Sequence, residues 1–344
     1  MTRSKTILFM IAANAIGLGL ALFTVEFAVR WRVERGWWAA WKSFSGGTPY
    51  SEFGTGNLLV ADPELGYRFN PAYPGVNSLG LRGPEPSPPG RKRLIVLGDS
   101  VAAPVDGFVS LLGKRLGPRW EVINAAVFGY TTYQERKLLE RNLLPLGPKL
   151  VVLQYCVNDN HQFLHRFDRQ NRMLTTEEAQ RTLVGSSGLG GWLARHSYLA
   201  FRVRVSWLRV SGKGKGQFPW DNRSDVGIAW QDHPWKQFEE HLRAIRDGVK
   251  QAGGGLVVVM APFRPQLDPE VLNRGPSYVL KPQAKMAEIC GRNQVPLLDL
   301  YPVFARRGGV DLFFDDYHFN PGGHEVVAGA LAEFLAGRGL LELR

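Results

Sequence analysis

The stretch Arg93-Leu-Ile-Val-Leu-Gly-Asp-Ser100 joins a short aliphatic run to a glycine and then to a serine. A run of this length, bounded by glycine, predicts a buried β-strand. The serine follows the strand directly, at the end from which parallel sheets present their functional groups. A Gly-Asp-Ser tripeptide also occurs in ordinary turns, so the position after a strand is what makes this serine a candidate nucleophile.

Four further runs of this kind follow along the chain, and segments with helical spacing of apolar residues alternate with them. The predicted strands are 93–97, 121–124, 150–155, 256–260 and 296–300, and the predicted helices are 107–116, 132–143, 235–251, 279–292 and 322–336. This alternation predicts an α/β fold in which helices cover both faces of a parallel sheet, with right-handed crossovers. Functional residues are expected just after the strands.

A carboxylate and a histidine lie close together near the carboxyl end, in Asp315-Asp-Tyr-His318, just before a predicted helix. Asp315 can accept a hydrogen bond from His318 Nδ1 and so fix the tautomer whose Nε2 takes the proton of a serine. Asp316 is the rival orienter, although the adjacent residue usually points elsewhere. Taken singly, His318 is more simply a capping or core histidine.

Two further strand ends carry groups that suit an oxyanion hole. Gly129 follows the second predicted strand, and its backbone N–H can approach a substrate oxygen closely because the residue has no side chain. Asn158 follows the third strand, and its amide can donate to the same oxygen. With the Ser100 N–H this makes three donors, each worth roughly 3 kcal/mol to a transition state. Four elements in order at successive strand ends favour a Ser100–His318–Asp315 triad.

On these residues the sequence resembles the SGNH (GDSL-type) hydrolase superfamily, whose four sequence blocks centre on Ser, Gly, Asn and His. Gly98-Asp-Ser100 resembles the first block, Gly129 the second, Asn158-Asp159 the third and Asp315-x-x-His318 the fourth. The resemblance implies a three-layer α/β/α sandwich with a flavodoxin-like parallel sheet of five strands in the order 2-1-3-4-5. It also implies a serine nucleophile, no metal or other cofactor, and hydrolysis or transfer of ester-linked acyl groups.

The resemblance spans residues 93–337, and Asn77–Gly83 resembles the stretch before the first block in bacterial membrane-anchored members. Two departures stand out. Cys156 replaces the glycine usual two residues before the third-block asparagine, which would narrow the site or shift its loop. Residues 101–104, Val-Ala-Ala-Pro, replace the usual Leu or Phe followed by glycine, which would stiffen the turn after the serine.

An uncharged, mostly apolar run from Ile7 to Val25 predicts a single membrane-spanning helix, because at about 1.5 Å per residue it roughly spans a bilayer. An interfacial belt of tryptophans follows it, at Trp31, Trp37, Trp38 and Trp41. A cleavable signal peptide is the alternative, but the run is long and lacks a clear cleavage site. Positive charges flank both ends, so the expected orientation rests on the resemblance, which places the catalytic domain on the periplasmic side.

We therefore expect a membrane anchor and interfacial segment at 1–41, a linker and pre-domain segment at 42–92, and a hydrolase domain at 93–344. The ordered core is expected to start after the proline-rich Pro84–Pro89. A basic insertion at about 161–234 breaks the alternation, and its glycine-rich centre lacks the spacing of a phosphate loop. Its tryptophans suit a small core better than a sugar or a lipid surface; they are Trp192, Trp207, Trp220 and Trp230.

Composition limits the remaining classes of protein. Of 344 residues, 44% are hydrophobic and 21% charged, which excludes a disordered chain. The net charge of +11 is scattered and accompanies no nucleic-acid fold signature, so no nucleic-acid partner is expected. It suits anionic headgroups, an acidic polymer or simply a soluble surface. Cys156 and Cys290 form no CxxC or zinc pattern and are expected to be core thiols.

The lead hypothesis is a membrane-anchored serine esterase that removes small O-acyl groups from a cell-envelope carbohydrate. Its expected partners are an acylated carbohydrate or small ester and, through the N-terminal helix, a lipid bilayer. An O-acyltransferase on the same site is one alternative, because only the acceptor of the acyl group differs. A non-catalytic subunit of a membrane complex with protein partners is another, since a fold alone does not guarantee a working site.

Overall fold

The structure, a computed structural model, describes residues 5, 9–10, 12–28, 58–88, 90–160, 189, 192–193, 197, 199–200, 203, 218–223 and 226–342. The chain divides into two units, and each is described by itself. One unit is Asn57–Phe163 with Gly216–Arg344, and the other is Met1–Gly56 with Leu164–Lys215. The first unit contains the sheet and all the predicted site residues.

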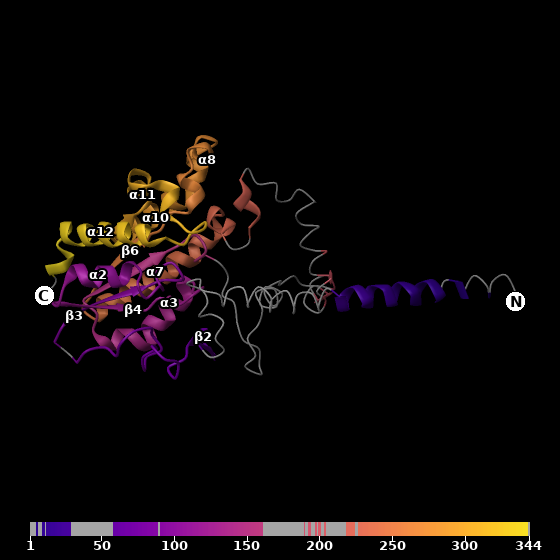
Figure 1. The fold of residues 1–344 in the computed structure, drawn as a ribbon, viewed down its shortest axis with the longest axis horizontal. Coiled ribbons are helices and arrows are strands. Elements are labelled where there is room, and N and C mark those ends of the chain that lie inside the picture. The colour runs from indigo at the N-terminus through magenta and orange to yellow at the C-terminus, as the bar shows by residue number, and fades with distance from the viewer. Residues whose placement is uncertain are drawn as a thin grey trace. The chain divides into compact units, whose positions relative to one another are not determined.

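A five-stranded parallel sheet forms the centre of the first unit (Figure 1). Its strands are β3 (Lys92–Leu97), β4 (Trp120–Asn124), β5 (Leu150–Tyr155), β6 (Gly255–Met260) and β7 (Leu297–Asp299), in the order β4-β3-β5-β6-β7. Counted in chain order, this is 2-1-3-4-5. The predicted α/β fold with a parallel sheet is confirmed, and every predicted strand range overlaps an observed strand.

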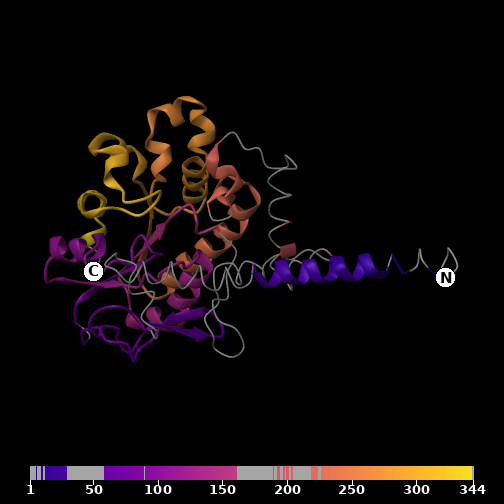
Figure 2. The same cartoon turned by 45° about the vertical axis from the view of Figure 1, so that its right-hand side comes forward.

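All six residues of β5 are buried, which shows that helices cover both faces of this sheet. On one side α2 (Phe108–Leu116) packs against α12 (Pro321–Gly337), and on the other α3 (Thr132–Leu138) packs against α7 (His233–Gln251) (Figure 1, Figure 2). Helix α10 (Lys281–Arg292) is joined to α7 by a hydrogen bond from Arg292 to Glu239 (2.7 Å). The predicted helix 132–143 continues beyond α3 as a π-helical turn, η2 (Leu139–Leu143).

Short helices and 3-10 turns connect these elements. They are η3 (Leu144–Leu146), η4 (Pro219–Asn222), η5 (Gly227–Trp230), η6 (Arg264–Leu267), α8 (Pro269–Asn273), α9 (Pro276–Val279), α11 (Tyr301–Arg307), η7 (Gly309–Leu312) and η8 (Leu340–Glu342). Proline stands at the first or second position of many of them, where its fixed φ favours the start of a helix.

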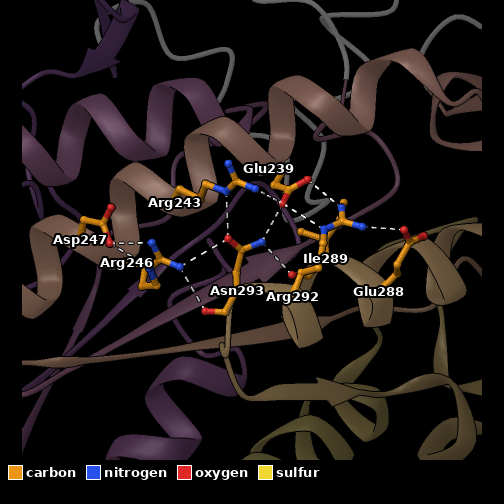
Figure 3. A network of polar contacts seen from close by, with 8 residues as sticks. All are labelled: Glu239, Arg243, Arg246, Asp247, Glu288, Ile289, Arg292 and Asn293. Atoms are coloured by element: carbon orange, nitrogen blue, oxygen red, sulfur yellow. Dashed lines mark hydrogen bonds and ion pairs between the residues drawn. The ribbon is translucent and has the colours of Figure 1, made fainter.

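A polar network joins α7 to α10 on the outside of the sheet (Figure 3). Glu239 of α7 lies at its centre and accepts hydrogen bonds from Arg243 (2.6 Å), Arg292 (2.7 Å) and Asn293 (2.9 Å). The Arg292 guanidinium, with Asn293 and Arg243 and against the opposing effect of burial, lowers the pKa of Glu239 from 4.5 to about 2. The carboxylate therefore stays charged at neutral pH and ties the two helices together.

A β-hairpin precedes the sheet, with β1 (Leu59–Asp62) paired antiparallel to β2 (Gly66–Phe69). Leu65, Tyr67 and Phe69 are fully buried, so the hairpin is part of the folded unit. This differs from the expected start of the ordered core after Pro84–Pro89. The reason is that four-residue strands are too short to give a clear periodic signal, and that tertiary contacts hold the hairpin in place.

The end of the predicted insertion also belongs to the first unit. Trp220 and Trp230 are buried against Phe263, with ring centroids 5.6 and 5.9 Å from it, and Trp230 Nε1 donates to the Tyr278 carbonyl oxygen (2.9 Å). The core interpretation is confirmed for these two tryptophans and is wrong for Trp192, whose side chain is half exposed. Trp207 and the glycine-rich centre of the insertion lie outside the described residues.

In the second unit, residues 12–28 are helical. Glu26 in this helix accepts hydrogen bonds from Ser197 Oγ (2.8 Å) and from the Leu199 N–H (2.8 Å), so part of the insertion contacts the N-terminal helix. Within the described ranges, no helix has both the length and the apolar character that a membrane span requires. The tryptophans expected at the interface lie outside the described residues.

Candidate active site

The predicted nucleophile Ser100 begins a tight turn directly after β3. The Asp99 carbonyl oxygen accepts hydrogen bonds from the N–H groups of Ala102 (3.2 Å) and Ala103 (3.1 Å), and Asp99 Oδ1 accepts one from the Val101 N–H (2.9 Å). The turn thus forms without the glycine that is usual after the serine. Ser100 thus stands just beyond the carboxyl end of β3 and retains 9% exposure.

Gly98 makes this turn possible because it lies against a neighbouring strand. A Cβ atom at this position would lie 2.6 Å from Gln154 Oε1 and 3.0 Å from the Ala102 Cβ. Both neighbours are buried, so neither can move away easily. Glycine is therefore required here by close packing.

The three predicted triad residues meet in space. Ser100 Oγ lies 2.8 Å from His318 Nε2, and His318 Nδ1 lies 2.7 Å from Asp315 Oδ2. With Nδ1 protonated toward the carboxylate, Nε2 is free to accept the serine proton. The ring is also held by Tyr317, whose own ring packs edge-on to it at 4.4 Å between centroids.

The charge of Asp315 is stabilised locally. Its Oδ1 accepts hydrogen bonds from the backbone N–H groups of Tyr317 (3.0 Å) and His318 (2.9 Å). Partial burial alone would raise the pKa of Asp315, but the hydrogen bonds from the His318 side chain and these two N–H groups together lower it to about 2. Asp315 is therefore ionised throughout the neutral range, as an orienter of the histidine must be.

The rival carboxylate, Asp316, is directed elsewhere. It forms an ion pair with Arg223, and its carbonyl oxygen accepts a hydrogen bond from the Arg264 N–H (2.7 Å). Asp316 thus holds together the segments around the site, and the histidine contacts Asp315 alone of the two.

The two other predicted residues lie on turns bound to the end of β3. Asn158 Nδ2 donates to Asp99 Oδ2 (3.0 Å), which uses one of the two amide hydrogens. Gly129 is exposed and has φ +69°, a conformation that favours glycine, and its loop is held by a hydrogen bond from the Val127 N–H to the Gly98 carbonyl oxygen (3.1 Å). The structure therefore places both residues on the edge of the sheet that carries Ser100.

Asp99 is a functional candidate that sequence reasoning missed. It is fully buried and contacts both the serine turn and Asn158. Burial raises its pKa, although the Val101 N–H and the Asn158 amide oppose that rise. The only sequence signal was its position beside Ser100.

The departure at Cys156 leaves the third block intact. The Cys156 N–H donates to Asp159 Oδ2 (2.8 Å), and its carbonyl oxygen accepts from the Asp159 N–H (2.9 Å), which closes the turn that carries Asn158. The thiol is buried, and burial raises its pKa well above the ordinary value. Like Cys290, it is a free core thiol, as predicted.

Two acidic side chains lie buried beneath this site. Glu135 of α3 and Asp159 are within electrostatic range of each other and of Asp99. Burial, and then the neighbouring carboxyl groups, raise the pKa values of Glu135 and Asp159 well above the ordinary range. These two groups therefore favour the protonated form inside the fold.

The sequence matches the GDSL-like Lipase/Acylhydrolase family over residues 96–326. No curated protein matches the chain. Similar solved structures include a lipase/acylhydrolase from Enterococcus faecalis (TM-score 0.43, 16% identity, 72% of this chain and 96% of that chain), TesA (TM-score 0.43, 17% identity, 72% and 99%) and a catalytic mutant of Axe2, an acetylxylan esterase from Geobacillus stearothermophilus (TM-score 0.42, 14% identity, 71% and 94%). The chain belongs to the GDSL-like lipase/acylhydrolase family and is a serine ester hydrolase of the SGNH superfamily.

Proposed function

We propose that the protein hydrolyses small O-acyl esters on a cell-envelope carbohydrate, with Ser100 as nucleophile, His318 as general base and acid, and Asp315 as the orienter of His318. The observation that carries this proposal is the continuous hydrogen-bonded chain from Ser100 Oγ through His318 to Asp315, with links of 2.8 and 2.7 Å. Such a chain activates a serine hydroxyl, which is a weak nucleophile by itself.

Acylation starts when Ser100 Oγ attacks the ester carbonyl carbon and its proton passes to His318 Nε2. The ionised Asp315 stabilises the imidazolium that forms. The N–H groups of Ser100 and Gly129 and the remaining amide hydrogen of Asn158 donate to the oxyanion of the tetrahedral intermediate. When this intermediate collapses, His318 gives the proton to the leaving sugar alkoxide, and the acyl group remains on Ser100.

Deacylation repeats these steps with water. A water molecule attacks the acyl-serine carbonyl while His318 Nε2 takes a proton from this water. His318 then gives the proton to Ser100 Oγ as the acyl-serine ester bond breaks. The products are a carboxylic acid and the free enzyme.

The substrate class rests on the resemblance to membrane-anchored members and on the expected N-terminal span. The purified full chain is expected to release acetate from acetylated oligosaccharides and from 4-nitrophenyl acetate, and Ser100→Ala is expected to abolish both activities. If the wild type released no acyl group from any ester, the proposed function would be refuted. Turnover of the activated ester alone would remove the carbohydrate part of the proposal.

We further propose that residues 1–41 anchor the protein in a membrane with the hydrolase domain on the periplasmic side. A membrane-impermeant fluorophosphonate applied to intact cells is expected to label Ser100 after the outer membrane has been made permeable. Labelling that also required disruption of the inner membrane would place the domain on the cytoplasmic side.

A further inference from the structure

Two tyrosines connect the N-terminal hairpin to the loop that carries Gly129. The Tyr67 hydroxyl of β2 donates to the Phe128 carbonyl oxygen (2.7 Å), and the Tyr130 hydroxyl donates to the Tyr67 carbonyl oxygen (2.7 Å). Their rings pack edge to face at 5.4 Å between centroids, and both side chains are fully buried. The hairpin therefore holds the residues on each side of Gly129.

Further contacts extend this connection along the loop and into α3. The Phe69 ring packs edge-on against Phe128 at 5.6 Å between centroids. Gln134 Nε2 donates to the Leu65 carbonyl oxygen (2.8 Å), while Gln134 Oε1 accepts from the Thr131 N–H (3.1 Å) at the start of α3. The hairpin thus contacts the segment before Gly129 and the helix cap after it.

Charged pairs fix the hairpin to the same helical segment. Arg141 of η2 lies 3.0 Å from Asp62 at the end of β1, and Lys137 of α3 lies 2.9 Å from Glu64 in the hairpin turn. The Arg141 hydrogen bond and the backbone N–H groups of Leu65 and Glu64 outweigh the effect of burial and lower the pKa of Asp62. Hydrogen bonds, ring contacts and ion pairs therefore hold the hairpin and residues 128–141 together.

This arrangement matters because glycine cannot fix its own conformation. Gly129 has φ +69°, and a glycine has many other backbone conformations accessible to it. The direction of the Gly129 N–H therefore depends on the contacts that fix Phe128 and Tyr130. An oxyanion donor must be directed in advance at the place where charge develops. We infer that Tyr67, supported by Tyr130, is a positioning residue that directs the Gly129 N–H; this inference rests on the proposed function of Gly129 in the oxyanion hole.

The hairpin lies before the residues that match the family, 96–326. This chain thus uses a segment outside the matched domain to complete the geometry of its site. The predicted pre-domain segment, in its part from residue 58 onward, is then a component of the catalytic unit.

Tyr67→Phe tests the inference because it removes one hydroxyl and leaves the ring in place. We expect kcat for an activated acetyl ester to fall about tenfold with KM changed less than about twofold, since a small misplacement of a catalytic group affects the transition state selectively. The inhibition constant of a trifluoromethyl ketone, whose hemiketal oxygen mimics the oxyanion, is expected to rise by a similar factor. Tyr278→Phe is the matched control, because it removes a hydroxyl that donates to Asp221 (2.6 Å) far along the chain from Gly129.

Tyr130→Phe, which removes the second hydroxyl of the pair, is expected to act in the same direction and serves if Tyr67→Phe does not fold. Assays are made below the melting temperature of every variant. Unchanged kcat and inhibition in both variants, with an active wild type, would overturn the positioning role alone. A wild type that neither hydrolyses esters nor binds the ketone would instead refute the proposed function.

Discussion

The proton path of the site depends on one imidazole ring that is held at both nitrogens. His318 Nδ1 is held by an ionised carboxylate, and Nε2 faces the Ser100 hydroxyl. The carboxylate in turn is held by two backbone N–H groups of its own turn, including that of His318. The spacing of three residues between Asp315 and His318 allows all these bonds within a single turn.

Two adjacent aspartates give a sharp test of this arrangement. Asp315→Asn is expected to lower kcat by roughly 10²- to 10⁴-fold with little change in KM, because the amide no longer favours the productive tautomer. Asp316→Asn is the control, since Asp316 pairs with Arg223 and does not contact the histidine. Steady-state kinetics on a soluble ester decide the matter. Equal losses in the two variants would mean that the assignment of the orienter is mistaken.

At the level of elements, the predicted strands and helices were found where buried apolar runs alternate with helical spacing. Burial on both faces gave β5 and its neighbours a signal that does not depend on distant contacts. The hairpin had no such signal, because β1 and β2 have four residues each and are stabilised by contacts with residues 59 to 79 positions away.

The residues of the site likewise differ in whether the local sequence or only distant contacts reveal them. Ser100, Gly129 and Asn158 were predictable because strand ends of a parallel sheet converge at one edge. The bond between Asn158 and Asp99, 59 residues apart, and the contact of Tyr67 with Phe128 depend on side-chain directions that a single sequence does not encode locally. The spacing in the sequence favoured Asp315 over Asp316 as the orienter, and in the structure Asp315 contacts His318 while Asp316 pairs with Arg223.

The network between α7 and α10 predicts how acid affects stability. Because the pKa of Glu239 falls from 4.5 to about 2 on folding, its contribution is present above pH 4.5 and is lost as the pH falls toward 2. Glu239→Gln is expected to lower the free energy of unfolding by about 1 kcal/mol at pH 7 and to flatten its decline in acid. Urea unfolding between pH 2.5 and 7 measures both.

Glu288→Gln provides the control for this network. Glu288 is half exposed and pairs with Arg292 alone among the network's arginines, so its loss is expected to change stability by less than about 0.5 kcal/mol. If the two variants lost the same stability, Glu239 would not be the centre of the contact between α7 and α10.

At the scale of the whole molecule, the carboxyl groups buried beneath the active site lower the free energy of unfolding as the pH rises. Folding raises the pKa of Glu135 above its ordinary value of 4.5. As the pH rises past 4.5, the unfolded chain therefore loses the Glu135 proton at a lower pH than the folded protein does, and the free energy of unfolding falls. Glu135→Gln has no proton to lose and is expected to show a shallower decline in the free energy of unfolding between pH 5 and 8. An unaltered slope would mean that Glu135 is ionised in the folded protein.

Distant segments of one folded unit converge to activate Ser100, and the rate of its reaction with a fluorophosphonate measures this activation directly. We predict that the purified full chain takes up one equivalent of probe at Ser100, and that His318→Ala lowers the rate of labelling by roughly a thousandfold while the fold is retained. Labelling of the His318→Ala variant at the wild-type rate, or modification of a residue other than Ser100, would contradict it.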